Sequence, residues 1–391
     1  TISFISPSRN NLSYLKWMYN SIRKNLGYRH EILLADDFSS DGTWEWLQKI
    51  KKTDQNIKVF RNEGPERKGI VYWYDYLCEK ASNDIVMFLH ADMYVTPKMD
   101  EEILKHIKPG VVVTATRIEP SLHPPGLEKI IADYGIEPEE FDEQKFLRDL
   151  DKFKKGETTE GVFAPWAIYK DDYWAVGGHD DLFAPQSKED SDIFNRLQLN
   201  GCKFVQTWDG FVYHMTSRGS RFNPMAGGAP GKDSPEWLHT TTKNMRNFIR
   251  KWGHMVKHDP LMKPIIPPKY DIGFVVKNCD YGLLYELEPW CSTIYIGHDF
   301  DAKHYIDQEQ SNTLYNLDER IHSIRMEEKE NDILVEFDAR ELTPQQFNYI
   351  ANLSEILAND EELEVGEFKL GIFNINIKRI KTYEKENIHN S

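Results

Sequence analysis

Apolar and polar positions alternate in blocks along the first hundred residues, and each block has the period of one kind of element. A short apolar run at residues 2–5 is followed by apolar positions every three or four residues from Leu12 to Leu26, and then by Gly27. This spacing predicts a strand and then a helix that ends at the glycine. Further strands are predicted at 32–34, 57–60 and 85–89, and further helices at 44–50 and 69–80. Such alternation predicts an α/β fold with a mostly parallel sheet, which binds ligands beyond the carboxyl ends of its strands.

The pattern becomes less regular beyond residue 110. A strand is predicted at 111–115, and the charged stretch 120–160 is predicted to be helical and partly exposed. Glycines and prolines crowd residues 217–234, which predicts a mobile loop, and a helix is predicted at 237–252. Pro264, Pro267 and Pro268 then indicate a domain boundary, so we expect one domain at 1–265 and another at 266–391.

The second predicted domain is smaller and of the α+β class. Its strands are predicted at 272–276, 333–337 and 368–377. A helix is predicted at 343–357, with Thr343 as N-cap and Pro344 in the first position. No motif assigns this domain a role. Acceptor recognition, formation of a homo-oligomer and docking of another partner all stay open for it.

Length and composition are those of a globular protein. Two domains suit 391 residues, and 40% hydrophobic residues are enough for a packed core. No apolar run reaches the ~18 residues of a membrane span, so we expect no transmembrane segment. The first residues lack the basic start and cleavage site of a signal peptide and are expected to form a strand. The four cysteines form no CxxC pair, which favours free thiols in a cytoplasmic protein over a zinc site.

The chain is acidic, and its charge is unevenly distributed. The formal net charge is −15, from 48 basic and 63 acidic residues. Residues 266–391 hold 25 of the acidic and 12 of the basic residues, a net charge of −13, which leaves −2 for residues 1–265. Nucleic acids and anionic membranes bind basic faces, so this balance argues against both as partners. The predicted first domain is close to neutral and can accommodate an anionic ligand.

An acidic turn follows the second predicted strand. The segment Ala35-Asp36-Asp37-Phe38-Ser39-Ser40-Asp41-Gly42-Thr43 lies between that strand and a helix. A carboxylate there can accept a hydrogen bond from a nucleotide base or a ribose hydroxyl, and the helix N-terminus favours phosphate. The same residues can equally form a turn and cap the helix. The spacing alone does not decide between the two roles.

Five segments follow one another along residues 1–255 in the order seen in a known family. They are Ser6-Pro7-Ser8-Arg9-Asn10; the acidic turn; Phe88-Leu89-His90-Ala91-Asp92; Gly177-Gly178-His179-Asp180 with Lys188-Glu189-Asp190-Ser191-Asp192 and Arg196-Leu197; and Phe248 with Lys251-Trp252-Gly253. Together they resemble glycosyltransferase family 2, a group of inverting sugar transferases. The resemblance implies the GT-A fold, a Rossmann-like sheet flanked by helices. His90 stands where the family has the first Asp of an Asp-x-Asp motif, and His179 where it has the Phe of Gly-Gly-Phe-Asp.

The resemblance implies a divalent cation, Mn²⁺ or Mg²⁺, beside Asp92. Such an ion neutralises the charge of a departing nucleoside diphosphate. Carboxylate oxygens suit both ions, and imidazole also suits Mn²⁺. By the resemblance, Asp92 holds the ion, His214 supplies a further ligand, and His90 contacts the ion or the ribose. Each histidine could instead be an ordinary core or strand-end residue.

The remaining site residues are also implied by the resemblance. Asp190 would be the general base that deprotonates the acceptor hydroxyl, with Glu189 beside it; the alternative is that these acids only cap a helix. Contacts to the nucleotide sugar are implied for Pro7, Ser8, Arg9, Asp36, Asp37, Arg67, Lys68, His90 and Ala91. Contacts to the acceptor are implied for Trp166, Gly178 and Asp192.

These features predict a metal-dependent inverting glycosyltransferase. Its donor would be a nucleotide-diphosphate sugar, with UDP expected before GDP or dTDP, and its acceptor a hydroxyl of a glycan, lipid, protein or small molecule. A sugar nucleotidyltransferase, the first alternative, should begin with a glycine-rich triphosphate loop, but Ser6 to Arg9 contain no glycine. A catalytically silent nucleotide-sugar-binding protein, the second alternative, is supported by His90 and opposed by Glu189-Asp190.

Overall fold

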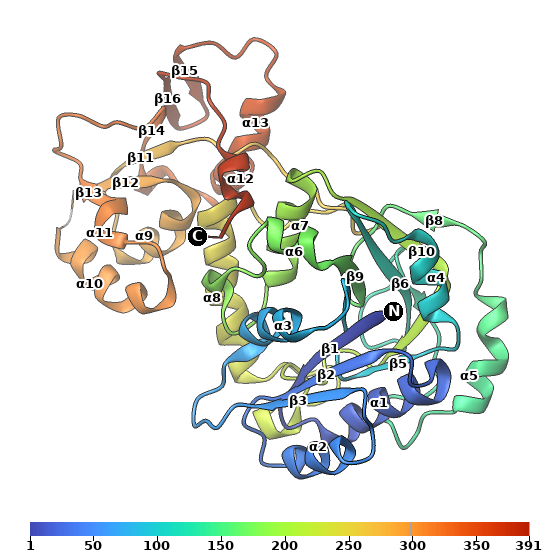
Figure 1. Ribbon diagram of the computed structural model, residues 1–391. Coiled ribbons are helices and arrows are strands. Elements are labelled where there is room, and N and C mark those ends of the chain that lie inside the picture. The colour runs from blue at the N-terminus through green and yellow to red at the C-terminus, as the bar shows by residue number, and fades with distance from the viewer. Residues whose placement is uncertain (298, 391) are drawn as a thin grey trace. The chain divides into compact units, whose positions relative to one another are not determined.

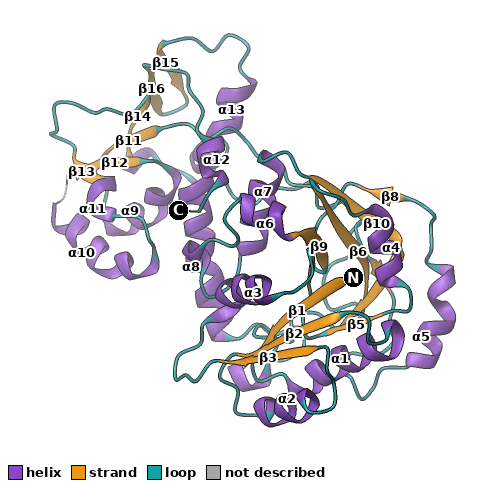
Figure 2. Cartoon of the chain, viewed as in Figure 1, coloured by secondary structure: helices purple, strands orange, loops and turns teal. Residues whose placement is uncertain are grey.

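The computed structural model describes residues 1–297 and 299–390, which form two compact units (Figures 1 and 2). The first unit contains residues 1–241, 258–265 and Asn390, and the second contains 242–257 and 266–389. Residues 242–257 thus group with the second unit, whereas the sequence predicts a single boundary near residue 265. The separation into independent domains stays a prediction.

The first unit is built around a ten-stranded mixed sheet. Its spatial order is β3-β2-β1-β4-β9-β6-β10-β5, with β7 paired to β6 and β8 to β10. The strands are β1 (Ile2–Ser8), β2 (Glu31–Asp36), β3 (Ile57–Arg61), β4 (Ile85–Phe88), β5 (Met93–Val95), β6 (Val111–Glu119), β7 (Ile130–Ile131), β8 (Thr158–Thr159), β9 (Trp166–Tyr169) and β10 (Lys203–His214). Strands β3, β2, β1 and β4 are parallel, as are β6 and β10, whereas β9 runs antiparallel between β4 and β6. The predicted α/β architecture is confirmed.

Helices connect the strands of this sheet. They are α1 (Leu12–Leu26), α2 (Thr43–Lys51), α3 (Gly69–Lys80), α4 (Met99–His106), α5 (Glu143–Asp149), α6 (Lys170–Ala175), α7 (Glu189–Leu199) and α8 (Pro235–Trp252), which begins in this unit and ends in the second. The apolar face of α1, with Leu15, Met18 and Ile22, is fully buried in the core beside β1 and β2. Gly27 follows α1 at φ +76°, a conformation that favours glycine.

The stretch 120–160 differs from its predicted helical structure. Its helices are α5 and the short 3₁₀ turn at Leu150–Lys152, and β7 and β8 also lie in it. Four prolines within residues 120–138 interrupt the backbone hydrogen bonding that a longer helix needs.

The second unit has a six-stranded sheet of order β13-β12-β11-β14-β16-β15. Its strands are β11 (Ile272–Lys277), β12 (Thr293–Ile296), β13 (Ile321–Ser323), β14 (Ile333–Asp338), β15 (Gly366–Leu370) and β16 (Phe373–Ile377). Its own helices are α9 (Tyr281–Leu287), α10 (Asp299–Glu309), α11 (Leu317–Arg320), α12 (Pro344–Ala351) and α13 (Leu353–Asn359). It contains both helices and strands, as predicted, and β13, β12, β11 and β14 are parallel neighbours, which the sequence analysis did not predict.

Two predicted elements of this unit are divided in the structure. The strand predicted at 368–377 is a hairpin of β15 and β16, which turns at Gly371 with φ +59°. The helix predicted at 343–357 is α12 followed by α13, with Asn352 between them in a non-helical conformation. Thr343 caps α12 by accepting the N–H of Gln346, as predicted.

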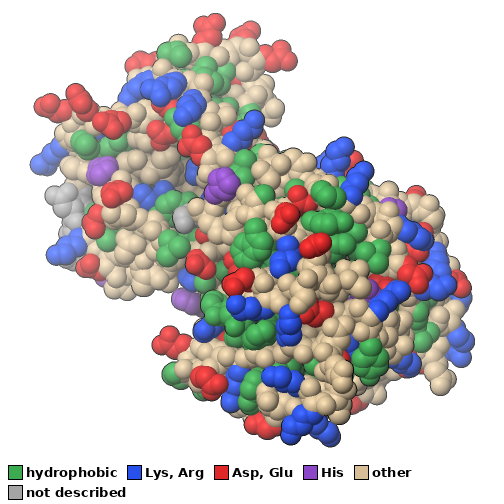
Figure 3. All heavy atoms as spheres, viewed as in Figure 1, with side chains coloured by type: hydrophobic (Ala, Val, Ile, Leu, Met, Phe, Trp, Pro, Cys, Tyr) green, Lys and Arg blue, Asp and Glu red, His purple; other side chains and the backbone are tan. Residues whose placement is uncertain are grey.

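Much of the acidity of this unit lies on its surface. Asp360, Glu361 and Glu362 are exposed between α13 and β15, and acidic side chains are visible on the outer face of the unit in Figure 3. Among the described residues, no helix has both the length and the apolar content needed to cross a membrane. All four cysteines are buried free thiols, as predicted. The cytoplasmic location stays a prediction.

Buried charges of the second unit gather around Glu288, whose side chain is fully buried. It accepts hydrogen bonds from Arg250 (2.8 Å), Arg320 (2.6 Å) and the Tyr305 hydroxyl (2.8 Å). Arg250 also donates to Glu309 at 2.6 Å. Burial alone would raise the pKa of Glu288, but Arg320 and Arg250 lower it to about 2. This cluster holds the last turns of α8 within the second unit.

We expect the substitution Glu288→Gln to lower the free energy of unfolding by about 3–5 kcal/mol, because Arg320 would stay buried without a counter-charge and Arg250 would keep only Glu309. Urea denaturation followed by circular dichroism measures the loss. Glu286→Gln, at an exposed position of α9, is the matched control and should change stability by less than about 0.5 kcal/mol. Equal unfolding curves for the two variants would contradict the role of the cluster.

Candidate active site

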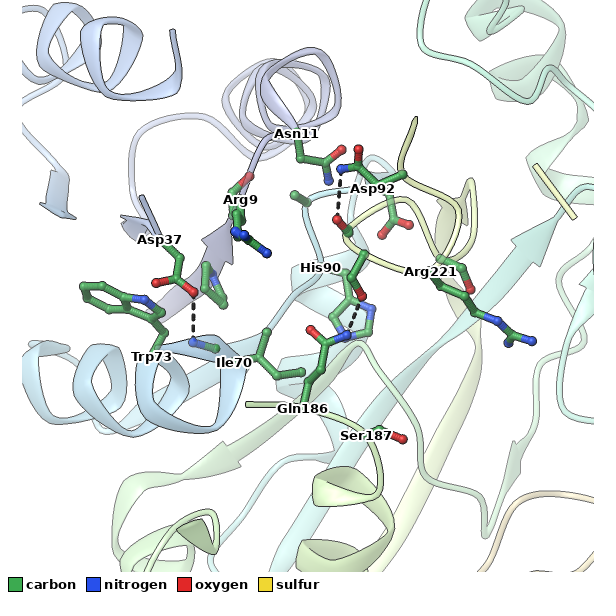
Figure 4. A pocket seen from close by; sticks show the side chains of 18 of the residues that line it. Arg9, Asn11, Asp37, Ile70, Trp73, His90, Asp92, Gln186, Ser187 and Arg221 are labelled. Atoms are coloured by element: carbon green, nitrogen blue, oxygen red, sulfur yellow. Dashed lines mark hydrogen bonds between the residues drawn. The ribbon is translucent and has the colours of Figure 1, made fainter. Parts of the chain in front are cut away.

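A cavity of about 370 Å³ lies where β1, β2 and β4 end. Parallel pairing sets Ser8 beside Asp36 and Ile5 beside Phe88, so the residues that follow these strands meet at one edge of the sheet. In Figure 4, Asp37 lies on one side of the cavity with Trp73, His90 lies on the other side, and Arg9 lies between them.

The structure brings together most residues predicted for the site. Twelve of the sixteen line the cavity: Pro7, Ser8, Arg9, Asp37, Arg67, His90, Ala91, Asp92, Trp166, Glu189, Asp190 and His214. The other four, Asp36, Lys68, Gly178 and Asp192, are not part of the lining, and each has a structural role.

Two of these four are buried carboxylates with partners in the protein. Asp36 accepts the backbone N–H of Ser39 at 2.9 Å and lies 3.7 Å from Nε of Arg61. Burial raises its pKa. Asp192 pairs with Arg196 at 2.7 Å, one helical turn further along α7, and both side chains are fully buried. Asp36 therefore stabilises the turn after β2, and Asp192 stabilises α7. The predicted ligand contacts of both residues stay predictions.

The other two residues outside the lining are Lys68 and Gly178. The ammonium group of Lys68 donates to the Tyr72 hydroxyl at 3.2 Å and lies 4.2 Å from the centre of the Tyr72 ring. Gly178 has φ +73°, and a Cβ atom there would lie 2.8 Å from the Asp75 carboxylate. Lys68 thus extends along the surface of α3, and Gly178 permits a tight approach to Asp75. Their predicted contacts to the donor and the acceptor stay predictions.

Asp37 accepts hydrogen bonds at the start of a helix and also lines the cavity. Its carboxylate accepts hydrogen bonds from the backbone N–H groups of Lys68 (2.9 Å) and Gly69 (2.8 Å) and from the amide of Asn62 (2.9 Å). It therefore caps α3, while Asp41 accepts the N–H of Thr43 at the start of α2. The Asp37 side chain also lines the cavity, so the capped helix start is held at the site.

Two arginines of the lining share a single carboxylate. Arg9 Nη1 lies 3.2 Å from Glu236, which is in the first turn of α8, and Arg67 Nη1 forms a short ion pair with the same oxygen. Arg67 also donates to Gln186 at 2.6 Å. Burial alone would raise the pKa of Glu236, but the arginines lower it. The group therefore has one positive charge in excess, which favours an anionic ligand.

Three potential metal ligands converge in the same cavity. One ligand atom from each of His90, Asp92 and His214 lies within 4.8 Å of the other two. Nε2 of His214 is 3.4 Å from Asp92, and it is buried without a hydrogen-bond partner. On the opposite side of the ring, Nδ1 lies 2.8 Å from Glu119, which fixes the orientation of the imidazole. Two imidazoles and a carboxylate form a donor set that fits a divalent cation, and they suit Mn²⁺ better than Mg²⁺.

The charges of these groups depend strongly on one another. Burial lowers the pKa of His90 to about 4, so its ring is neutral and free to bind a cation. Burial alone would lower the pKa of His214, but Asp92 and Glu119 raise it to about 9. Burial would likewise raise the pKa of Asp92, but His214 and His90 hold it well below its ordinary value. Asp92 is also held by the backbone N–H of Arg218 at 2.9 Å.

Two carboxyl groups with different environments begin α7. Glu189 is buried, its Oε2 has no hydrogen-bond partner, and burial together with the neighbouring Asp190 raises its pKa to about 8. Asp190 is exposed and accepts the N–H of Ser191 at 2.6 Å. Glu189 therefore keeps its proton at neutral pH, whereas Asp190 is open to a substrate that enters from solvent.

Other residues of the lining were not singled out by the sequence analysis as site residues. They include Trp73, Gln186 and Glu236, and six residues of the loop 217–234, among them Asn223. Glu236 is far from the family motifs along the chain, and no local pattern indicates it. His179 also lines the cavity, and its departure from Gly-Gly-Phe-Asp was the one available signal.

Comparison with known proteins gives matches in the N-terminal part of the chain. Residues 3–176 match the family model described as glycosyl transferase family 2. The match covers the strands around Arg9, Asp37, His90 and Asp92 and ends before α7.

Two curated proteins are similar over shorter segments. A dolichol-phosphate mannosyltransferase of Pyrococcus furiosus is 29% identical over 110 residues, which are 28% of this chain and 30% of that protein. The putative teichuronic acid biosynthesis glycosyltransferase TuaG of Bacillus subtilis is 32% identical over 91 residues. These are 23% of this chain and 35% of that protein. The chain thus spans about a third of the length of these relatives.

Solved structures with a related backbone are more distant in sequence. GalNAc-T7 with UDP, GalNAc and Mn²⁺ has a TM-score of 0.47 and 18% identity, covering 64% of this chain and 48% of that chain. Residues 1–349 of S. aureus TarS in complex with UDP-GlcNAc have a TM-score of 0.40 and 16% identity, covering 64% of this chain and 72% of that chain.

The convergence of His90, Asp92 and His214 leads to a prediction about metal binding. We expect His214→Ala to reduce Mn²⁺ affinity more than 100-fold. Glu119→Gln should reduce it about 10–100-fold, because it removes the carboxylate that orients the ring. Titration of free Mn²⁺ followed by electron paramagnetic resonance measures both effects. His258→Ala, which removes an exposed histidine outside the lining, is the control and should bind like the unmodified protein. Equal affinity of His214→Ala and this control would contradict the assignment.

Proposed function

Because residues 3–176 match the family model of glycosyl transferase family 2, we propose that this protein is a metal-dependent, inverting glycosyltransferase. Its donor would be a nucleotide-diphosphate sugar, with UDP as the nucleotide, and its acceptor would react through a hydroxyl group. The observation that carries the proposal is one cavity that combines three potential cation ligands, two arginines and an exposed carboxylate at a helix start. These are the groups needed to bind a diphosphate and to activate a hydroxyl.

The cavity offers a separate region for each part of the donor. Asp37 and Trp73 lie at one side, where a base and ribose would bind, and His90 lies at the other (Figure 4). Arg9, between them, would donate hydrogen bonds to the diphosphate, together with Arg67. In this order, the sugar end of the donor would lie near His90 and Asp92.

Asp92, His214 and His90 are the residues that would hold a Mn²⁺ ion. When bound, the ion would neutralise negative charge on the nucleoside diphosphate as the glycosidic bond breaks. Glu119 contributes by keeping Nε2 of His214 directed at Asp92.

Asp190 would act as the general base. Its carboxylate would take the proton of the acceptor hydroxyl while the acceptor oxygen bonds to the anomeric carbon, on the face opposite the departing diphosphate. Such an in-line displacement inverts the configuration at that carbon. The exposed position of Asp190 allows an acceptor to approach from solvent, whereas buried Glu189, which keeps its proton, is the poorer base.

The proposal is tested with a panel of nucleotide sugars, UDP-, GDP- and dTDP-linked, with and without Mn²⁺. We expect Mn²⁺-dependent binding of at least one donor, and slow hydrolysis detected as released nucleotide. Asp190→Asn should lower this turnover about 10²–10⁴-fold and leave the Kd of the donor within about twofold, because a general base acts on the barrier and not on donor binding.

Asp259→Asn is the control, because this aspartate lies outside the cavity lining. Unchanged turnover in Asp190→Asn would overturn the base assignment. If the unmodified protein bound none of the panel, the enzyme proposal itself would be wrong.

The shared partner of the two arginines generates a further prediction. In Glu236→Gln, Arg9 and Arg67 lose the carboxylate that competes with a diphosphate, so we expect UDP to bind about 3–10-fold more tightly. Isothermal titration calorimetry at two salt concentrations measures the change, which should shrink at high salt. Glu63→Gln, at a highly exposed glutamate outside the lining, is the matched control. Weaker UDP binding in Glu236→Gln would show instead that the carboxylate holds the arginines in place for the ligand.

A further inference from the structure

His179 is a buried histidine of the cavity lining with only 3% of its surface exposed. Its Nδ1 lies 2.5 Å from the Tyr173 hydroxyl and 3.3 Å from the Asp75 carboxylate. Its backbone N–H donates to the same Asp75 oxygen at 2.9 Å. Three contacts therefore fix the position and the rotation of the ring.

These contacts also determine which edge of the ring faces the cavity. Neither Tyr173 nor Asp75 is part of the lining, whereas His179 is. The Nδ1 edge is thus turned away from the cavity, and the opposite edge, which carries Nε2, belongs to the lining. Among the described residues, no protein group forms a hydrogen bond with Nε2.

The partners of Nδ1 set the chemical character of Nε2. The Tyr173 hydroxyl has one proton, and it forms a short hydrogen bond with the Asp75 carboxylate, a stronger acceptor than an imidazole nitrogen. Burial and Asp75 raise the pKa of Tyr173, so the phenol stays protonated. The phenol oxygen then accepts the proton of Nδ1, which leaves Nε2 as the hydrogen-bond acceptor.

The surroundings of His179 suit a sugar ring. Its imidazole stacks on Tyr74, with ring centres 5.6 Å apart, and Trp166 lies in the same lining, stacked on Phe88 at 3.9 Å. Aromatic surfaces of this kind pack against the C–H faces of sugars. Glu189, also in the lining, has a buried carboxyl oxygen without a partner. A buried acceptor and a buried carboxyl group beside aromatic rings are complementary to hydroxyl groups, which both donate and accept.

We infer that Nε2 of His179 accepts a hydrogen bond from a hydroxyl group of the transferred sugar and so helps to select the donor. The inference rests on the proposed function. The family pattern has a phenylalanine at this position. A phenylalanine could pack against the same sugar but could not form a hydrogen bond with a hydroxyl group. In this protein the histidine would add a hydrogen-bond acceptor to an aromatic surface that packs against the sugar. Asp75 and Tyr173 would be its positioning residues.

The experiment compares the affinities of UDP and of UDP-sugars for His179→Phe in the presence of Mn²⁺. The sugar used is the one most tightly bound by the unmodified protein among UDP-glucose, UDP-galactose, UDP-GlcNAc and UDP-GalNAc. We expect the Kd of UDP to stay within about twofold and the Kd of the UDP-sugar to rise about tenfold, the equivalent of one hydrogen bond. Monodeoxy analogues of that UDP-sugar identify the hydroxyl: one of them should bind equally well to the variant and to the unmodified protein.

Tyr173→Phe provides a second, milder variant, because it keeps the imidazole and removes only the hydroxyl group that orients it. We expect a smaller rise in the Kd of the UDP-sugar than in His179→Phe, with UDP again unchanged. His258→Phe, at an exposed histidine outside the lining, is the control, and thermal unfolding checks that each variant is folded.

Three outcomes would count against the inference, and they are distinguishable. An unchanged Kd of the UDP-sugar in both His179→Phe and Tyr173→Phe overturns the inference alone. Equal weakening of UDP and UDP-sugar also overturns it, since the residue would then act on the nucleotide or on the whole site. If the unmodified protein binds no nucleotide sugar, the proposed function fails, and this inference fails with it.

Discussion

Parallel pairing of β1 with β2 on one side and β4 on the other is the constraint on which the site depends. The backbone N–H of Asp37 donates to Ser8 at 2.9 Å, and that of Leu89 donates to Ile5 at 3.0 Å, so the chain leaves all three strands at one edge of the sheet. A shift of one residue in either register would turn the following side chains to the other face. The near-complete burial of β1, β2 and β4 makes such a shift costly in free energy. Packing of the core therefore fixes the positions of the residues that line the cavity.

Three carboxyl groups at the site carry little net negative charge, because they are paired with basic side chains or protonated. Glu236 is paired with two arginines, Glu119 is paired with His214, and buried Glu189 keeps its proton. An anionic ligand therefore meets fewer free negative charges than the number of acids suggests. Asp190 differs from these three because it is exposed, and this difference is the reason for proposing it as the base.

The sequence predicted those parts of the structure that depend on local pattern. Continuous apolar runs identify β1 and β4, and helical spacing identifies α1, because burial dictates their composition. Local pattern does not predict the direction in which a side chain points, nor contacts between residues far apart in the sequence. Asp36 and Asp37 are neighbours with the same side chain, yet only Asp37 faces the cavity, since successive residues at a strand end point to opposite sides. Glu236 reaches Arg9 from 227 residues away, and only the folded chain brings them together.

The division into units also changes what the net charge means. Residues 242–257 contain five basic residues and no acidic one, and they belong to the second unit, where Arg250 lies beside Glu288. With them, the net charge of the second unit is −8 instead of the −13 counted for 266–391, and the first unit carries −7 instead of −2. The unit that contains the cavity is therefore acidic as a whole. Under the proposed function, attraction of a diphosphate would have to be local, from Arg9, Arg67 and a bound cation, because the long-range field of this unit repels anions.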